Sequence, residues 1–112
     1  METLAYDALV IATGADSFMP PIKGREKPGI YSLRDIEDGE KIDAAVKAGA
    51  KSAVIMGAGL IGLEVGVGLM ERGLTVTIVE LLPQILPQLL DADMAKMVQE
   101  RVSRCCARPP GP

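Results

Sequence analysis

The 112-residue chain contains no histidine and no tryptophan, and its only aromatic residues are two tyrosines and one phenylalanine. Without histidine it lacks the commonest metal ligand and acid–base group, so we expect no metal site. The two cysteines, Cys105 and Cys106, are adjacent, which excludes a disulfide framework and leaves only a strained vicinal ring. We therefore expect a frayed tail there rather than a redox centre, and an aliphatic core elsewhere.

Basic charge and long apolar runs are also scarce. The net charge is −3 and no cluster of lysine or arginine is dense, which argues against nucleic acid as a partner. The chain begins Met1-Glu2 without a basic region, and no apolar run has the length of a bilayer span. These absences favour a cytoplasmic protein without a membrane partner. Hydrophobic residues make up 48% of the chain, which is typical of a globular domain with an aliphatic, buried parallel sheet.

Residues 51–80 carry the most informative pattern in the chain. A short apolar run, residues 52–56, is followed by Gly57, Gly59 and Gly62 in the spacing G-x-G-x-x-G. This spacing suits a dinucleotide, because the first glycine permits a tight turn, the second admits a pyrophosphate and the third lets helix and strand pack closely. The alternative is a glycine-rich turn that serves packing alone.

The residues after the glycines complete a β-α-β pattern. Residues 60–72 predict a helix ended by Gly73, and residues 74–79 predict a second strand. Glu80 stands at the end of that strand, where a carboxylate can accept hydrogen bonds from ribose hydroxyls. No lysine or arginine follows until Lys96, which favours NAD over NADP. The predicted cofactor-binding residues of the motif are Gly57, Gly59, Leu60, Ile61, Gly62 and Glu80, with the phosphates on the free amides of the helix N-terminus.

This pattern resembles the NAD-binding domain of the flavin-dependent pyridine nucleotide-disulfide oxidoreductases, especially the NADH oxidase, NADH peroxidase and coenzyme A disulfide reductase branch. Residues 6–14, 29–34 and 86–94 add to the resemblance, which covers residues 3–102. It implies an intact parent in which NADH passes hydride to FAD, and reduced flavin passes electrons to oxygen, peroxide or a disulfide.

The resemblance also implies roles for residues outside the glycine motif. Ala12, Thr13 and Gly14 would lie close to the flavin nucleotide, and Glu64 would lie near the nicotinamide. The alternatives are an ordinary strand and turn for the first three and a surface glutamate for the last. Because a first FAD-binding glycine motif and the redox-active cysteine are absent from the sequence, we expect that FAD is not retained and that this chain alone is not a working enzyme.

The N-terminal part predicts a buried strand over residues 6–12, from its compact apolar run. Residues 15–29 are rich in proline and glycine, which predicts a crossover loop. Ser32 and Asp38 are candidate caps for two successive helical pieces. The second would turn its apolar residues inward, namely Ile42, Ala45 and Val46, and would end at Gly49.

The C-terminal part predicts a loop over residues 81–90 and then a helix capped by Asp91. Apolar residues recur at helical spacing in this helix and are expected in the core: Met94, Met97, Val98 and Val102. From Ser103 on, the sequence is typical of an unrelated flexible tail.

Together these features predict an α/β protein with a truncated Rossmann-type parallel β-α-β fold. Its expected parts are a remnant strand and crossover loop of the FAD domain (1–33), a partial NAD(H)-binding domain (34–102) and the tail (103–112). Two functions stay open. The chain is either the NAD(H)-binding portion of a flavin-dependent oxidoreductase, or a non-catalytic fragment that self-associates, for instance as a strand-exchanged dimer, because its strands leave unpaired edges.

Overall fold

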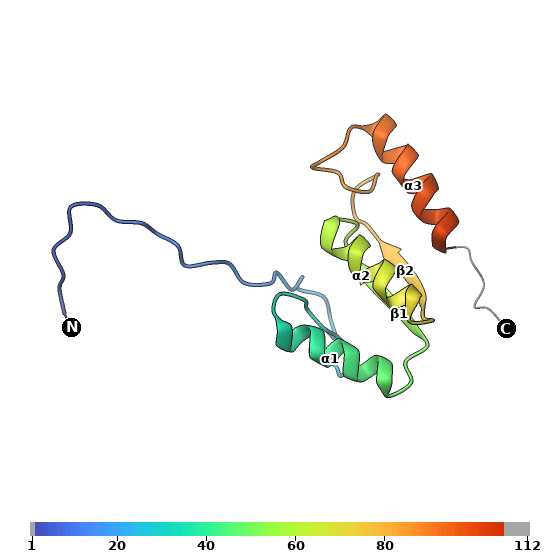
Figure 1. Cartoon of the computed structure of the whole chain (residues 1–112), viewed down its shortest axis with the longest axis horizontal. Coiled ribbons are helices and arrows are strands. Elements are labelled where there is room, and N and C mark those ends of the chain that lie inside the picture. The colour runs from blue at the N-terminus through green and yellow to red at the C-terminus, as the bar shows by residue number, and fades with distance from the viewer. Residues whose placement is uncertain (1, 107–112) are drawn as a thin grey trace. The chain divides into compact units, whose positions relative to one another are not determined.

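The structure is a computed structural model that describes residues 2–106, with side chains through Ser103 (Figure 1). The predicted tail beyond residue 106 lies outside the described residues. The chain falls into two units, with the boundary between Asp43 and Ala44, and each is considered by itself. No helix in the described part is both long and apolar enough to cross a membrane.

The first unit lacks the buried strand predicted over residues 6–12. Residues 2–21 form neither helix nor strand (Figure 1), and the side chains of Leu9, Val10 and Ile11 are 62%, 86% and 78% exposed. The prediction is wrong because a buried strand needs a hydrogen-bonded neighbour and cover on its faces, and the described residues supply neither. The loop predicted over residues 15–29 is confirmed, since it contains no helix and no strand.

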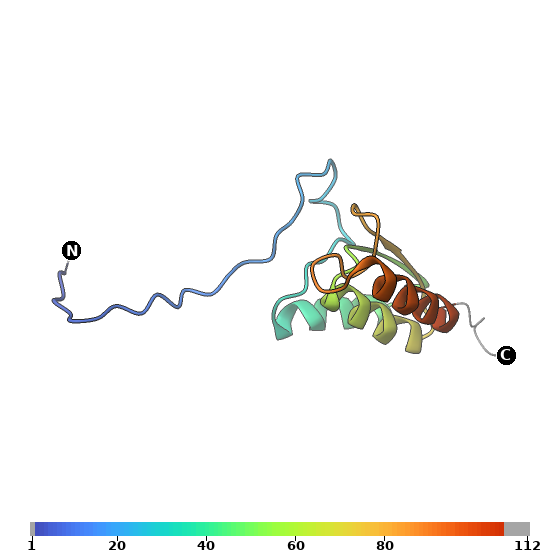
Figure 2. The same cartoon turned by 90° about the horizontal axis from the view of Figure 1, so that it is seen from above.

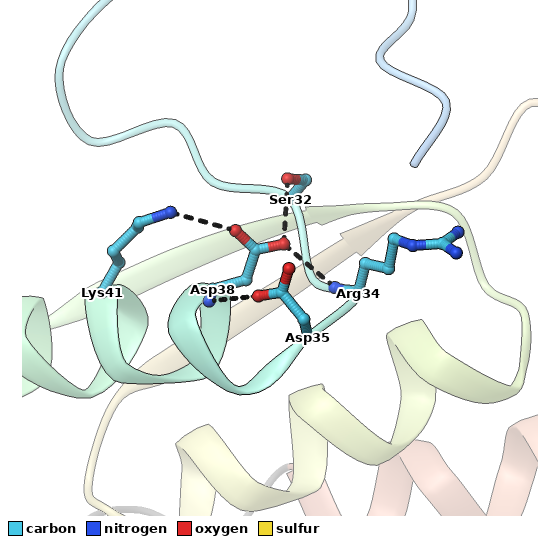
Figure 3. A network of polar contacts seen from close by, with 5 residues as sticks. All are labelled: Ser32, Arg34, Asp35, Asp38 and Lys41. Atoms are coloured by element: carbon cyan, nitrogen blue, oxygen red, sulfur yellow. Dashed lines mark hydrogen bonds and ion pairs between the residues drawn. The ribbon is translucent and has the colours of Figure 1, made fainter. Parts of the chain in front are cut away.

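A single helix, α1 (Ile36–Lys47), replaces the two predicted helical pieces. Its cap is Asp35, whose Oδ1 accepts the backbone N–H of Asp38 at 2.9 Å. The carboxylate of Asp38 turns back and accepts the N–H of Arg34 at 3.1 Å and the hydroxyl of Ser32 at 3.4 Å (Figure 3). Asp38 therefore secures the start of one helix instead of beginning a second.

The helix α1 carries an ion pair on its surface and ends in hydrogen bonds near Gly49. Lys41 Nζ lies 3.3 Å from an oxygen of Asp38, a surface ion pair one turn apart (Figure 3). At the C-terminus, the N–H of Gly49 donates to Val46 and that of Ala50 donates to Ala45. These two bonds satisfy carbonyls that the helix leaves without partners, so the helix ends where it was predicted to end.

The second unit confirms the predicted β-α-β order. Strand β1 (Ser52–Met56), helix α2 (Leu60–Glu71) and strand β2 (Thr75–Val79) follow one another, and the strands pair in parallel with Ser52 opposite Thr75 and Met56 opposite Val79. Helix α2 ends in a left-handed glycine, Gly73, with φ +87°. The N–H of Gly73 donates to Met70 at 2.8 Å and that of Leu74 donates to Leu69 at 3.1 Å, which is the Schellman arrangement.

Helix α2 packs on one face of the sheet through a glycine. A β-carbon at Gly66 would lie 3.3 Å from Ile78 Cδ1 and 3.4 Å from Ile55 Cδ1, so an alanine there would require these side chains to shift by a few tenths of an ångström. The glycine at position 66 thus serves the close packing of helix on sheet. Nothing in the structure explains the glycine at position 68.

The opposite face of the sheet is open, which corrects the prediction of a buried parallel sheet. Val54 and Met56 are 68% and 61% exposed, and Thr75, Thr77 and Val79 point to the same side. Apolar strands alone do not ensure burial, because covering both faces of a parallel sheet takes a layer of helices on each.

Helix α3 (Ala92–Cys106) begins at the predicted cap, where Asp91 Oδ1 accepts the N–H of Met94 at 3.0 Å. Its inward stripe runs through Ala95, which is fully buried, to the half-buried Val98 and Val102. Met94 and Met97 are exposed, so their assignment to the core is wrong, because they lie beside this stripe rather than on it. The helix continues beyond Ser103, where the tail was predicted to begin.

Candidate functional site

The turn between β1 and α2 needs two of its glycines for its own geometry. Gly57 has φ +107°, a left-handed conformation that side chains disfavour, and its N–H donates to Val79 O at 2.8 Å. A β-carbon at Gly62 would overlap the carbonyl oxygen of Gly57. These two positions therefore fold the turn and seat the helix against it.

Gly59 is different, because no feature of the fold requires a glycine there. Its φ and ψ of −80° and −178° are extended, and a β-carbon would meet no described atom within 4 Å. Gly59 is the N-cap of α2 without a side-chain cap, and the first turn carries no acid. The amides of the first helical residues, Leu60, Ile61 and Gly62, have no acceptor within a helix and adjoin this open space. This arrangement suits an anion.

Ala58, between the first two glycines, is held by backbone hydrogen bonds on both sides. Its N–H donates to Glu80 Oε2 at 2.7 Å, and its carbonyl accepts the N–H of Leu86 at 2.9 Å. Ala58 is 1% exposed. Residues from the end of β2 and from the following loop therefore fix the shape of the glycine turn.

Glu80 is ionised at neutral pH. The backbone N–H groups of Leu82, at 2.9 Å, and of Ala58 hold the pKa of its carboxyl below the usual 4.5. The two carboxylate oxygens together offer about four acceptor positions, and the backbone N–H groups of Leu82, Ala58 and Leu81 use three of them, which leaves one for a further hydrogen bond. Glu80 can thus fix the turn and bind a ribose hydroxyl at the same time.

Leu86 is a site residue that the sequence analysis missed. It lies within the predicted loop over residues 81–90, which is confirmed, and it is 8% exposed with φ +47°. A left-handed leucine costs about 1–2 kcal/mol, which its burial and its bond to Ala58 offset. A second bond, from Gln84 Nε2 to Leu90 O at 2.8 Å, closes the loop. The only sequence signal is Pro87, since the residue before proline disfavours the right-handed helical region.

A cavity of about 490 Å³ lies beside this site, between β2, α2, α3 and the loop. Its lining combines aliphatic side chains with the polar residues Glu80, Gln84, Gln99 and Ser103. Its aliphatic lining residues include Leu63, Val76, Ile78, Ile85 and Val102.

The structure brings together the predicted binding residues of the glycine motif: Gly57, Gly59, Leu60, Ile61, Gly62 and Glu80. Glu64 is exposed on α2 one turn further along. Ala12, Thr13 and Gly14 belong to the other unit, are exposed, and form neither helix nor strand. The predicted cofactor contacts of these residues stay predictions.

A parallel β-α-β unit with this glycine turn and an acid at the end of the second strand defines a partial Rossmann-type fold. Residues 1–104 match the family of pyridine nucleotide-disulphide oxidoreductases, and the chain belongs to that family.

Individual relatives agree with this membership. The chain is 48% identical over 100 residues to an NADH oxidase of Methanocaldococcus jannaschii, covering 88% of this chain and 22% of that one. It is 39% identical to a nitrite reductase [NAD(P)H] of Bacillus subtilis, and the match covers 88% of this chain and 12% of that protein. The solved structure of a NAD-dependent persulfide reductase from A. fulgidus superposes with a TM-score of 0.83 at 42% identity, covering 90% and 19%. The chain thus spans about a fifth of the length of the first and third of these proteins.

Proposed function

We propose that this chain binds NAD(H) through Gly57, Gly59, Gly62 and Glu80. The observation that carries the proposal is the open position at Gly59. Glycine there is required by neither backbone nor packing, and a β-carbon would fill the space that a pyrophosphate needs in front of the α2 amides. The fixed turn supports it further, because Ala58 is held before any ligand arrives.

NADH is the preferred form in this proposal. The carboxylate of Glu80 is ionised and stands where the adenosine ribose would lie. A 2′-phosphate would meet this negative charge, and the next cation along the chain is Lys96.

The intact parent, in the same proposal, is a cytoplasmic oxidoreductase in which NADH passes hydride to FAD. Family membership and the names of the relatives support an oxidoreductase that uses NAD(H). FAD would require residues beyond Ala12, Thr13 and Gly14, so we expect a colourless purified sample of this chain.

Calorimetric titration with NADH and NADPH tests the binding proposal. Glu80→Ala is expected to weaken NADH binding and to reduce the preference for NADH over NADPH. Glu71→Ala, which removes a carboxylate from the opposite end of α2, is the matched control and leaves both unchanged.

The preference is the deciding measurement, because Glu80 also fixes the glycine turn. A purely structural role would weaken both cofactors equally and would leave their ratio as it was. If a folded sample binds neither cofactor, the alternative function becomes the better one, namely a non-catalytic fragment that self-associates.

A further inference from the structure

The sheet of the second unit has two free edges without the usual protection. Among the described residues it contains only β1 and β2. Neither strand contains a charged residue or a proline, the features that commonly prevent pairing with another chain. Two strands alone make a marginal sheet, so a third strand would stabilise this unit.

The edge of β2 offers free backbone groups. The N–H of Thr75 donates to Lys51 O at 2.9 Å, and Val79 O accepts from Gly57, so the backbone groups of these alternate residues point toward β1. In a parallel strand the intervening residues point the other way. The N–H and C=O groups of Val76 and Ile78 therefore face the free edge.

A cavity next to this edge could also receive side chains of an added strand. Helix α3 lies on the same side of the sheet as α2 (Figure 2) but makes few contacts with either strand. The cavity of about 490 Å³ separates it from β2, and no residue of β1 lines that cavity. A strand added along β2 would lie under α3 and would direct alternate side chains into the cavity.

The first unit contains a segment that fits this place. Residues 8–12, ALVIA, lie in the exposed stretch without secondary structure and contain β-branched residues but no charge and no proline. They match the five residues of β2 in length. In an extended strand Leu9 and Ile11 share one face, which could contact the aliphatic part of the cavity lining, namely Val76, Ile78 and Val102. Ala8, Val10 and Ala12 share the other face.

We propose that residues 8–12 of one chain pair with the free edge of β2 in a second copy, and that two chains exchange these segments in a closed dimer. The exchange gives each sheet a third strand and covers Leu9 and Ile11, which are otherwise exposed to solvent. It does not depend on nucleotide binding.

Sedimentation of the full 112-residue chain over a wide range of concentration tests the proposal. The expected species has twice the 11.8 kDa mass of the monomer. Val10→Pro removes a backbone N–H and converts the dimer to monomer. Val10 lies outside every helix and strand, so this change leaves the β-α-β unit folded. Phe18→Asp alters an equally exposed apolar residue outside the segment and leaves the dimer intact.

Amide hydrogen exchange identifies the edge that is used. In the dimer the amides of Val76 and Ile78 exchange slowly, and in Val10→Pro they exchange fast, whereas that of Thr77, which faces β1, stays protected in both. If the unmodified 112-residue chain is a monomer, the proposal is overturned. A dimer or larger species that Val10→Pro leaves unchanged, or one in which Val76 and Ile78 remain unprotected, also overturns it.

Discussion

Replacing Gly59 and Gly62 separately by alanine should separate ligand binding from packing in the glycine turn. At Gly62 the new β-carbon overlaps the carbonyl oxygen of Gly57, so helix and turn must move apart. Overpacking of this kind costs about 1–3 kcal/mol. The melting temperature of a domain of this size falls about 4–8 °C for each kcal/mol, so Gly62→Ala should melt clearly lower than the parent.

Gly59→Ala should leave stability almost unchanged. The β-carbon enters open space at an ordinary φ, and the loss of freedom in the unfolded chain contributes about 0.4–1 kcal/mol of stability. Alanine is a poorer N-cap than glycine, which costs roughly 1 kcal/mol. The two effects nearly cancel, so the melting temperature should shift by only a few degrees, while the methyl group blocks the pyrophosphate and NADH binding is lost.

Thermal melts by circular dichroism and calorimetric titration with NADH measure the two effects on the same samples. A Gly59→Ala chain that melts as low as Gly62→Ala would refute the described geometry of the turn. If Gly59→Ala instead keeps the melting temperature and the NADH affinity of the parent, Gly59 does not hold the pyrophosphate. A third outcome is that only Gly62→Ala has a lower melting temperature and that neither the unmodified chain nor Gly59→Ala binds NADH. This outcome would agree with the described geometry of the turn and would contradict the proposed binding of NAD(H).

Three further changes test other parts of the structure. The folded pKa of Glu80 lies below 4.5, so the stability that its carboxylate contributes is present above that pH and is lost as the pH falls through the folded pKa. The Glu80→Gln variant should therefore have a lower melting temperature than the unmodified chain at neutral pH. This difference in melting temperature should shrink on acidification. A difference that grows in acid would contradict the hydrogen bonds from Leu82 and Ala58. Leu86→Ala should lower the free energy of unfolding, measured with denaturant, by about 2–5 kcal/mol, because Leu86 is buried. Leu89→Ala, at an exposed position, should lower it by less than about 0.5 kcal/mol. Equal effects of the two substitutions would show that Leu86 is not buried. Asp35→Ala should lower the helix content of α1, because it removes an N-cap that contributes about 1 kcal/mol. Asp35→Asn should retain the helix content, because asparagine can also accept the hydrogen bond from the Asp38 N–H. An equal loss of helix content in both variants would show that the charge of Asp35 matters rather than this hydrogen bond.

Much of the second unit was predictable because its signals are local. Gly57, Gly62 and Gly73 mark conformations and contacts within a few residues of themselves, and Asp91 caps a helix that begins one residue later. Such features depend on short-range geometry, which the order of residues specifies directly. The candidate binding residues of the glycine motif followed from the same short stretch.

Most of the failed predictions depended on distant partners; the exception is the second helical piece, which local hydrogen bonds of Asp38 to Arg34 and Ser32 ruled out. The apolar run at residues 6–12 has the composition of a buried strand, but composition cannot supply the neighbour that a strand needs. Met94 and Met97 have helical spacing like Val98 and Val102, and only the packing of α3 decided which side faced inward. Leu86 carried no motif, because its role rests on one backbone bond to a residue 28 positions earlier.

The sequence by itself determined the β-α-β order, the glycine turn and the acid at the end of the second strand, because each rests on backbone geometry within a few residues. Only the tertiary structure showed that Glu80 and Leu86 hold Ala58 from two sides, that Gly59 opens onto free space, and that β2 has an uncovered edge. Those properties come from contacts between segments that are distant in the sequence and meet only in the folded chain, so local sequence patterns do not predict them.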